Sequence, residues 1–287
     1  VTVDIFGQPY DADQINAIAK KNKLYVIEDC AQAPYASYKG RWAGSLGDIG
    51  VFSLNYHKHI HTGEGGVIVT NNDELADRMR LIRNHAEAVV ADKGTKNIVN
   101  MIGFNFRMTE IEAAIGRCQL KKLKGFVKKR IINAHYLGRK IASIPGISAA
   151  PTRPECVHVY YDVPFFFDET TIGVTRNRFI EAVVAELKPM RSHEAEGVAI
   201  SSGYVKPLYL QPLYQQLTGY GDKGCPFRCP LYGGKPNYAK GICPTVERLH
   251  EKELFVLGLV HASMTKKDLD DVARAFEKVY KLRASLR

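Results

Sequence analysis

Residues 47–70 read GDIGVFSLNYHKHIHTGEGGVIVT. The two short apolar runs in this stretch, 51–54 and 67–70, have the length and β-branched content of buried strands. Between them lies a polar loop that carries Lys58 and the glycine cluster 63–66. A lysine held between two core strands cannot easily reach water, so it is either paired with a carboxylate or kept with a lowered pKa for covalent chemistry. A surface hairpin with a solvated lysine is the alternative that this stretch alone leaves open.

A carboxylate upstream favours the covalent interpretation. Asp29 follows the apolar run 24–27, and such a run after a helical pattern predicts a parallel strand covered on both faces. Ligands of open α/β sheets bind beyond the carboxyl ends of such strands, where Asp29 would lie. Pyridoxal 5'-phosphate (PLP) needs these two protein groups. The lysine forms a Schiff base with its aldehyde, and the carboxylate keeps its pyridine nitrogen protonated.

The first part of the chain has the order strand, helix, strand. Residues 1–5 are strand-like, and a helix is predicted from a cap at Asp11 to about Asn22, before the strand at 24–27. This order is a βαβ unit and implies a parallel sheet.

Later elements follow from capping patterns and apolar spacing. The capping box of Thr109 and Glu112 opens a long helix whose apolar positions recur to about residue 140. The remaining patterns predict helices over 73–84, 175–187 and 265–282, a strand over 157–167, and loops over 85–102 and 201–245.

The composition is that of an ordinary globular protein, with 45% hydrophobic and 24% charged residues among 287. No apolar run approaches ~20 residues, so we expect no transmembrane helix, and no signal-peptide pattern opens the chain. Six scattered cysteines favour a reducing, cytoplasmic location over a disulfide framework. The nearest approach to a metal motif is the pair Cys225 and Cys229, but no second tight pair accompanies it, so we predict no metal site.

The net charge of +10 has a local origin. Between Arg117 and Lys140 there are nine basic residues and no acidic one. Such a helix could attract nucleic acid or an anionic substrate. Because no nucleic-acid-binding motif accompanies it, we favour a solvated or interface-facing helix, with neither nucleic acid nor membrane as partner.

Three motifs resemble those of a known family. They are EDCAQA at 28–33, GSLGDIGVFSLNYHKHIHTGEGGVIVT at 44–70 and GFNFRMTEIEAAIG at 103–116. In this order they resemble the DegT/StrS group of sugar aminotransferases, which are PLP enzymes of fold type I. The resemblance covers the chain and is strongest over 24–124.

This resemblance implies an α/β fold with a mostly parallel sheet flanked by helices. Residues 1–140 would form part of the large PLP-binding domain, and residues 141–287 a smaller C-terminal α+β domain. In the family, a Gly/Thr phosphate cradle and an aromatic residue that stacks on the cofactor precede this region. We therefore expect the chain to be the C-terminal two-thirds or so of such an enzyme and to bind PLP poorly alone.

The resemblance also implies roles for individual residues. Lys58 would be the Schiff-base lysine, five residues after Ser53 as in the family pattern, and Asp29 would contact the pyridine nitrogen. Ser53 matches a residue that hydrogen-bonds the phosphate, and Gln32 one that reaches the ring region. Asn105 matches an asparagine that reaches the cofactor phosphate of the neighbouring subunit, which implies a homodimer with shared active sites.

The function that the resemblance implies is PLP-dependent transfer of an amino group to a keto-sugar. The donor would be glutamate or glutamine, and the acceptor a nucleotide-linked sugar in amino-sugar, polysaccharide or antibiotic-sugar biosynthesis. One branch of the family has histidine in place of the lysine and removes a sugar hydroxyl instead. Because His57 and His59 flank Lys58, a PLP-dependent sugar dehydratase is the first alternative. A non-catalytic binding protein of the same fold is the second.

Overall fold

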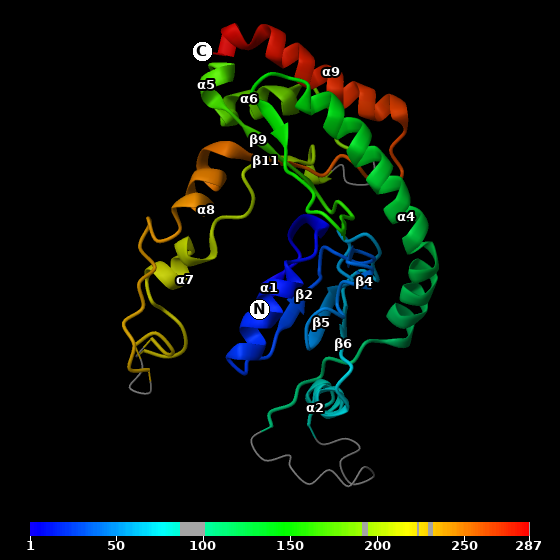
Figure 1. Cartoon of the computed structure of the whole chain (residues 1–287), viewed down its shortest axis with the longest axis vertical. Coiled ribbons are helices and arrows are strands. Elements are labelled where there is room, and N and C mark those ends of the chain that lie inside the picture. Colours follow the sequence, from blue (N-terminus) through cyan, green and yellow to red (C-terminus); the bar gives the residue numbers. More distant parts are fainter. Residues whose placement is uncertain (87–100, 191–194, 223, 229–231, 287) are drawn as a thin grey trace. The chain divides into compact units, whose positions relative to one another are not determined.

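Figure 1 shows a computed structural model of the chain, which describes residues 1–86, 101–190, 195–222, 224–228 and 232–286. The chain forms two compact units. The first unit comprises Val1–Ala134, Pro151–Asp162 and Val260–Ser263, and the second comprises His135–Ala150, Val163–Leu259 and Met264–Arg287. The division at Ala134 lies inside helix α4 (Glu110–Ala142). The boundary at residue 140 stays a prediction.

The first unit is built on a four-stranded sheet in the order β1-β2-β5-β6. Its strands are β1 (Thr2–Val3), β2 (Ile27–Asp29), β5 (Ile49–Ser53) and β6 (Gly66–Val69). β1, β2 and β5 are parallel, whereas β6 runs antiparallel to β5. The predicted βαβ unit is present, because α1 (Ala12–Lys21) connects β1 to β2 and is capped by the Asp11 side chain. The sheet is therefore mostly parallel (Figure 1).

Two strand predictions in this unit were wrong in detail. The run 24–27 was predicted as a strand, but Leu24 and Tyr25 are 63% and 72% exposed and β2 begins only at Ile27. Leu24 N–H donates to the Ala19 carbonyl, so the first part of the run ends α1 instead. The strand at 67–70 was predicted as buried, but β6 is exposed along its length because it lies at the sheet edge.

Smaller elements complete the first unit. A three-stranded sheet has the order β4-β3-β8. Its strands, together with the remaining short elements of this unit, are β3 (Ser37–Tyr38), β4 (Arg41–Trp42), β8 (Cys156–Val157), η1 (Ile5–Gly7) and α2 (Asp73–Arg83). The loop predicted over 85–102 lies mostly outside the described residues.

α4 begins as the sequence predicts. Thr109 N–H donates to the Glu112 carboxylate at 2.8 Å and Glu112 N–H donates to the Thr109 hydroxyl at 3.2 Å, which confirms the capping box. Residues 54–65 connect β5 to β6 and carry Lys58, and we call them the lysine loop. Leu123 and Val127 of α4 pack in a buried cluster against Leu54 at the start of this loop. The other buried members of the cluster are Cys30, Ala33, Ala36, Ala43, Ile60 and Val159. This core anchors the loop that carries Lys58 at Leu54 and Ile60, on either side of the lysine.

The second unit has an antiparallel sheet in the order β10-β11-β9-β7. The strands are β7 (Ile147–Ala149), β9 (Val163–Phe167), β10 (Ile200–Ser202) and β11 (Leu254–Leu257). The core is rich in fully or almost fully buried phenylalanines, Phe165, Phe167, Phe179, Phe255 and Phe276. Two amphipathic helices contribute to it, α6 (Arg176–Ala185) and α9 (Lys266–Leu282), close to where they were predicted.

Short helices occupy the rest of this unit. They are α5 (Glu169–Ile172), η3 (Leu208–Leu210), α7 (Pro212–Gln215), α8 (Pro244–Arg248), η4 (Leu249–Glu253) and η5 (Arg283–Leu286). The strand predicted over 157–167 is divided into β8 and β9, which belong to different sheets. Within the described parts of the chain, no helix is long and apolar enough to cross a membrane.

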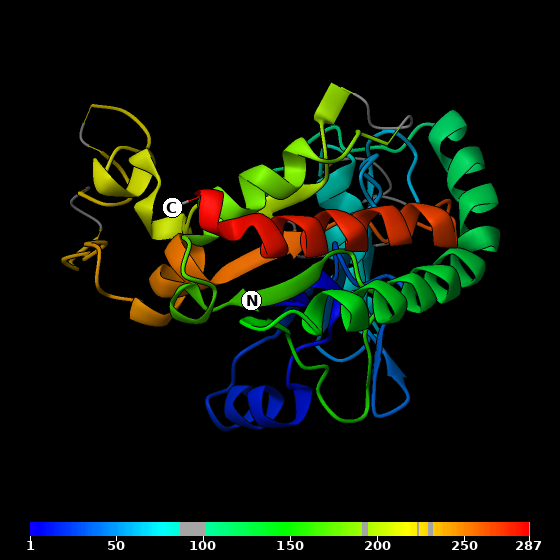
Figure 2. The ribbon, with the colours of Figure 1, turned by 90° about the horizontal axis from the view of Figure 1, so that it is seen from above.

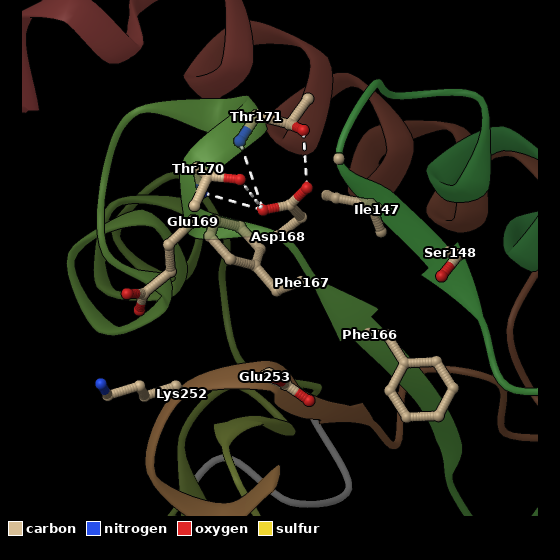
Figure 3. Close-up of a pocket in the computed structure, with 11 residues that line it drawn as sticks. Ile147, Ser148, Phe166, Phe167, Asp168, Glu169, Thr170, Thr171, Lys252 and Glu253 are labelled. Carbon is tan, nitrogen blue, oxygen red and sulfur yellow. Dashed lines mark hydrogen bonds between the residues drawn. The ribbon is translucent and has the colours of Figure 1, made fainter. Parts of the chain in front are cut away.

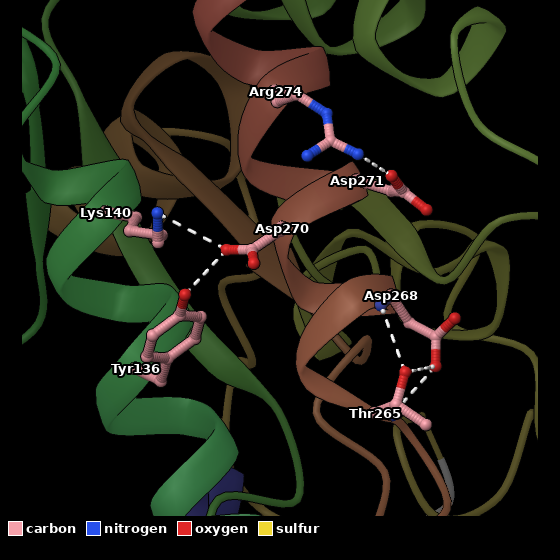
Figure 4. A network of polar contacts seen from close by, with 7 residues as sticks. All are labelled: Tyr136, Lys140, Thr265, Asp268, Asp270, Asp271 and Arg274. Carbon is pink, nitrogen blue, oxygen red and sulfur yellow. Dashed lines mark hydrogen bonds and ion pairs between the residues drawn. The ribbon is translucent and has the colours of Figure 1, made fainter.

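α9 lies beside the last turns of α4 (Figure 2). Tyr136 donates its hydroxyl hydrogen to Asp270 at 2.6 Å, and Lys140 pairs with the same carboxylate at 3.3 Å (Figure 4). The first turn of α9 is closed by the predicted capping box of Thr265 and Asp268. These contacts hold the two helices together within the second unit.

Candidate functional site

The lysine loop of the first unit is held by its own backbone. Ser53 ends β5, and its hydroxyl accepts the Asn55 N–H at 3.2 Å. Lys58 N–H donates to the Asn55 carbonyl at 2.9 Å, and Thr62 N–H donates to the Leu54 carbonyl at 3.0 Å. The chain therefore turns back immediately after β5, which fixes where Lys58 leaves the backbone.

The Lys58 side chain is half-buried, and its amine lies near an aromatic ring and two carboxylates. Its ammonium nitrogen lies 4.6 Å from the ring centroid of Tyr161. Burial lowers the pKa of Lys58, and the nearby carboxylates of Asp29 and Asp162 oppose this effect. The structure thus brings Lys58 and Asp29 into one site, although they are far apart in the sequence.

Asp29 and Gln32 come from the end of β2 and the turn that follows it. Asp29 is the last residue of β2, opposite Val51 of β5, and its carboxylate accepts the Ala31 N–H at 3.0 Å. The Gln32 side-chain carbonyl accepts the Phe6 N–H at 2.6 Å. Gln32 therefore holds the turn after β2 against the short helix η1. The roles of Asp29 and Gln32 toward a cofactor stay predictions.

Asn105 lies elsewhere in the first unit. It is exposed and forms an isolated antiparallel bridge with Asn84, just after α2. No contact among the described residues joins it to Lys58. Within one chain, the structure therefore collects Lys58, Asp29 and Ser53 around the lysine loop but leaves Asn105 outside that group.

Several site residues were missed in the sequence analysis. The Tyr160–Asp162 segment supplies the ring and the carboxylate beside Lys58, but it lay in a stretch predicted as strand. Arg130 donates from Nε to the Tyr160 carbonyl and from Nη2 to the Tyr161 carbonyl, both at 2.5 Å. It was hidden among the nine basic residues of α4. Its signal in the sequence is that it stands three residues after Val127 and seven after Leu123, on the apolar face of that helix.

His59 is buried directly after Lys58 and plays a structural part. Its Nε2 lies 3.0 Å from the Val159 carbonyl, which fixes the tautomer that carries hydrogen on Nε2. Burial lowers the pKa of His59 to about 3, and the charges of Arg130 and Lys58 act in the same direction. His59 is therefore a neutral donor at physiological pH.

A second cluster of titratable groups lies on the buried side of β2. A carboxylate oxygen of Asp4, one of Glu28 and the Cys30 sulfur lie within 4.8 Å of one another. Burial and the Glu28 carboxylate raise the pKa of Asp4 to about 7. A proton on Asp4 offsets part of the negative charge of this cluster. The prediction that the chain holds no metal stays a prediction. Cys229 lies outside the described residues.

The second unit contains an open pocket of about 660 Å³, shown in Figure 3. Its polar wall centres on Asp168, whose carboxylate accepts hydrogen bonds from the backbone and hydroxyl groups of Thr170 and Thr171. These bonds lower the pKa of Asp168 to about 2. The carboxylate is thus committed to capping α5, and the lysine loop of the first unit is the stronger candidate for chemistry.

Comparison with known proteins identifies relatives of the chain. The family model of the DegT/DnrJ/EryC1/StrS aminotransferases matches residues 1–228. The chain is 30% identical over 287 residues to the spore coat polysaccharide biosynthesis protein SpsC of Bacillus subtilis (strain 168), a match that covers 98% of this chain and 66% of that protein. It is 32% identical over 214 residues to a GDP-perosamine synthase of Escherichia coli O157:H7, covering 75% of this chain and 53% of that protein.

The fold agrees with these relatives. The structure of an aminotransferase from Psychrobacter cryohalolentis superposes with a TM-score of 0.77 at 28% sequence identity, covering 98% of this chain and 68% of that one. The chain spans 66% of the length of SpsC and 53% of the length of the GDP-perosamine synthase.

Proposed function

Because the chain belongs to the DegT/DnrJ/EryC1/StrS aminotransferase family, we propose that it moves an amino group from glutamate or glutamine to a nucleotide-linked keto-sugar. Members of this family use PLP. The observation that carries the proposal is that the half-buried Lys58 amine lies near enough to the Asp29 carboxylate for this charge to raise the pKa of Lys58 against burial. Relatives named for polysaccharide biosynthesis and for a GDP-linked sugar support the substrate class.

The residues present fit PLP. Lys58 would hold the cofactor covalently, and burial favours the neutral amine that such a bond requires. Asp29, at the carboxyl end of a parallel strand, would keep the pyridine nitrogen protonated. When bound, PLP supplies an electron sink that stabilises a carbanion beside the transferred nitrogen.

The other proposed site residues act in binding. Ser53 would donate its hydroxyl hydrogen to the phosphate while accepting the Asn55 N–H. Gln32 would border the ring through the turn that follows Asp29, and Asn105 would complete the phosphate site of a second copy. Once released, the Lys58 amine would carry the proton between the substrate and the cofactor.

Amino transfer can be tested directly. The protein is supplied with PLP in excess, because the chain alone is expected to bind it weakly, and is incubated with candidate nucleotide keto-sugars and amino-labelled glutamate or glutamine. Mass spectrometry follows the label. We expect labelled amino-sugar from the unmodified protein and a loss of rate beyond about 10²–10⁴-fold in Lys58→Ala, because the covalent bond and the proton carrier disappear together. Lys20→Ala, which removes an exposed lysine of α1, serves as the control.

The alternatives give different results in the same experiment. Borohydride reduction should fix the cofactor on Lys58 and on no other lysine. A product that has lost oxygen without gaining nitrogen would support the sugar dehydratase instead. An adduct on a different lysine, or near-normal transfer by Lys58→Ala, would contradict the assignment of Lys58.

A further inference from the structure

The Lys58 amine faces the ring of Tyr161, and we propose that Tyr161 is a positioning residue that holds this amine whenever it is not bonded to a cofactor. The proposal rests on the proposed function for its role in catalysis, but the contact itself joins two residues of the chain and involves no cofactor. The Lys58 nitrogen lies 4.6 Å from the Tyr161 ring centroid, which is cation–π distance.

The backbone that carries Tyr161 is irregular and yet fully bonded. Val159 N–H donates to the Gly7 carbonyl at 2.9 Å, and Tyr161 N–H donates to the Phe6 carbonyl at 2.7 Å. Tyr160 N–H donates to Nδ1 of the His158 ring at 3.0 Å. All three amide donors of this segment thus have fixed partners.

The carbonyl groups of the segment are bonded too. Arg130 donates to the Tyr160 and Tyr161 carbonyls from one planar guanidinium, and the His59 ring contacts the Val159 carbonyl. Apart from His158, the partners come from η1, the lysine loop and α4, so three separate elements fix residues 159–161. Such complete pairing leaves the backbone beneath Tyr161 little freedom.

Tyr160 adds evidence that this geometry is imposed. Its φ angle is +50°, in the left-handed region that a bulky residue rarely adopts. Residues persist in such conformations only where the surrounding structure over-determines them, and they cluster at functional sites. The strained turn at Tyr160 directs the next ring toward Lys58.

His59 connects the loop that carries Lys58 to the segment that carries Tyr161. His59 follows Lys58 in the loop and bonds the Val159 carbonyl two residues before Tyr161. Any shift of the lysine loop must therefore move Val159 or break this bond. The Lys58 side chain and the Tyr161 ring are thereby held at a fixed position relative to each other. The ring, Asp29 and Asp162 all stabilise the ammonium form of Lys58, whereas burial favours the neutral amine.

The test uses the protein without added cofactor. Competitive labelling of lysines across a pH series, with mass spectrometry of the Lys58 peptide, measures the pKa of this single amine. We expect the pKa of Lys58 to fall by roughly 0.4–1.5 pH units in Tyr161→Leu, because the cation–π contact is lost. Tyr161→Phe keeps the ring and should leave the pKa near that of the unmodified protein.

A matched control and a measurement on the unmodified protein complete the experiment. Tyr25→Leu removes a ring of the first unit that is 72% exposed and lies outside this segment, and should leave the pKa of Lys58 unchanged. If Tyr161→Leu does not fold, reductive methylation of the unmodified protein with labelled methyl groups still decides the matter. The Lys58 methyl signal should be shifted upfield by the ring current of Tyr161.

The two proposals fail in different ways. An unshifted Lys58 methyl signal, or equal pKa values of Lys58 in Tyr161→Leu and the unmodified protein, would overturn the role of Tyr161 while leaving amino transfer intact. Absence of amino transfer together with the expected labelling shifts would overturn the proposed function and keep the contact. If both hold, Tyr161→Leu should lower kcat with little change in the KM of the sugar, while Tyr161→Phe restores it.

Discussion

Asp4 and Glu28 place two carboxyl groups in the interior of the first unit, and both are fully buried. One oxygen of Asp4 accepts the Tyr10 N–H at 2.8 Å, and one oxygen of Glu28 accepts the Leu46 N–H at 3.1 Å. The remaining oxygens, Asp4 Oδ2 and Glu28 Oε1, have no donor among the described residues. Two adjacent buried carboxylates cannot both be ionised at little cost, so the pair retains one proton.

This proton makes stability depend on pH. Burial and Glu28 raise the pKa of Asp4 to about 7 from 3.8, so between these values the folded chain holds a proton that the unfolded chain has lost. The free energy of unfolding should therefore fall as pH rises from about 4 to about 7, by an amount on the order of 3 kcal/mol. Asp4→Asn resembles the protonated state and should remove this fall.

The measurement is the difference in urea unfolding between Asp4→Asn and the unmodified chain across pH. The difference is needed because His59 makes stability depend on pH in the opposite direction. Its pKa is lowered to about 3 in the folded chain, so the free energy of unfolding falls as pH drops below about 6.5. This contribution is common to both proteins and cancels. Parallel stability curves for the two proteins would refute the shared proton.

At the scale of secondary structure, the sequence predicted what local interactions decide. The caps at Asp11, Thr109 and Thr265 depend on side chains within three residues, and all are present. Burial of β6 and the continuity of 157–167 depend on which segments pack alongside, and these predictions were wrong. A four-residue apolar run such as 67–70 does not indicate whether its strand lies at the edge or the centre of a sheet.

The cap of α9 gives a test at this scale. Thr265 accepts the Asp268 N–H while Asp268 accepts the Thr265 N–H, so Thr265→Ala leaves a helix donor without its partner. We expect the free energy of unfolding to fall by about 0.5–2 kcal/mol in urea titrations. Thr265→Ser, which keeps the hydroxyl, should cost much less. Equal losses in the two variants would show that the methyl packing of Thr265 matters, not the cap.

At the scale of the whole molecule, the candidate site was only partly predictable. Lys58 and Asp29 were found because their neighbouring motifs resemble those of a family, and the structure brings them together. Tyr161 and Arg130 were not found, because their places depend on contacts with residues remote in the sequence, as between Arg130 and the Tyr161 carbonyl. No local pattern records such a contact. The cytoplasmic location and the homodimer stay predictions.

The homodimer can be tested through Asn105, which is exposed and has no described contact with Lys58 in its own chain. If Asn105 completes the site of a second copy, Asn105→Ala should weaken PLP retention without lowering the unfolding temperature. Light scattering should report a dimer. Asn71→Ala, which removes an exposed asparagine just before α2, is the matched control.

A mixing experiment separates a shared site from one contained in a single chain. Lys58→Ala and Asn105→Ala proteins are each inactive in amino transfer if both residues are needed. When subunits exchange, a shared-site hybrid dimer has one site with both changes and one with neither, so an equal mixture should recover about a quarter of the unmodified sites. If Asn105 serves the site of its own chain, every site in the hybrid carries one change and no activity returns. Recovery of PLP binding and transfer on mixing, absent when either variant is mixed with itself, would place Asn105 across the subunit interface.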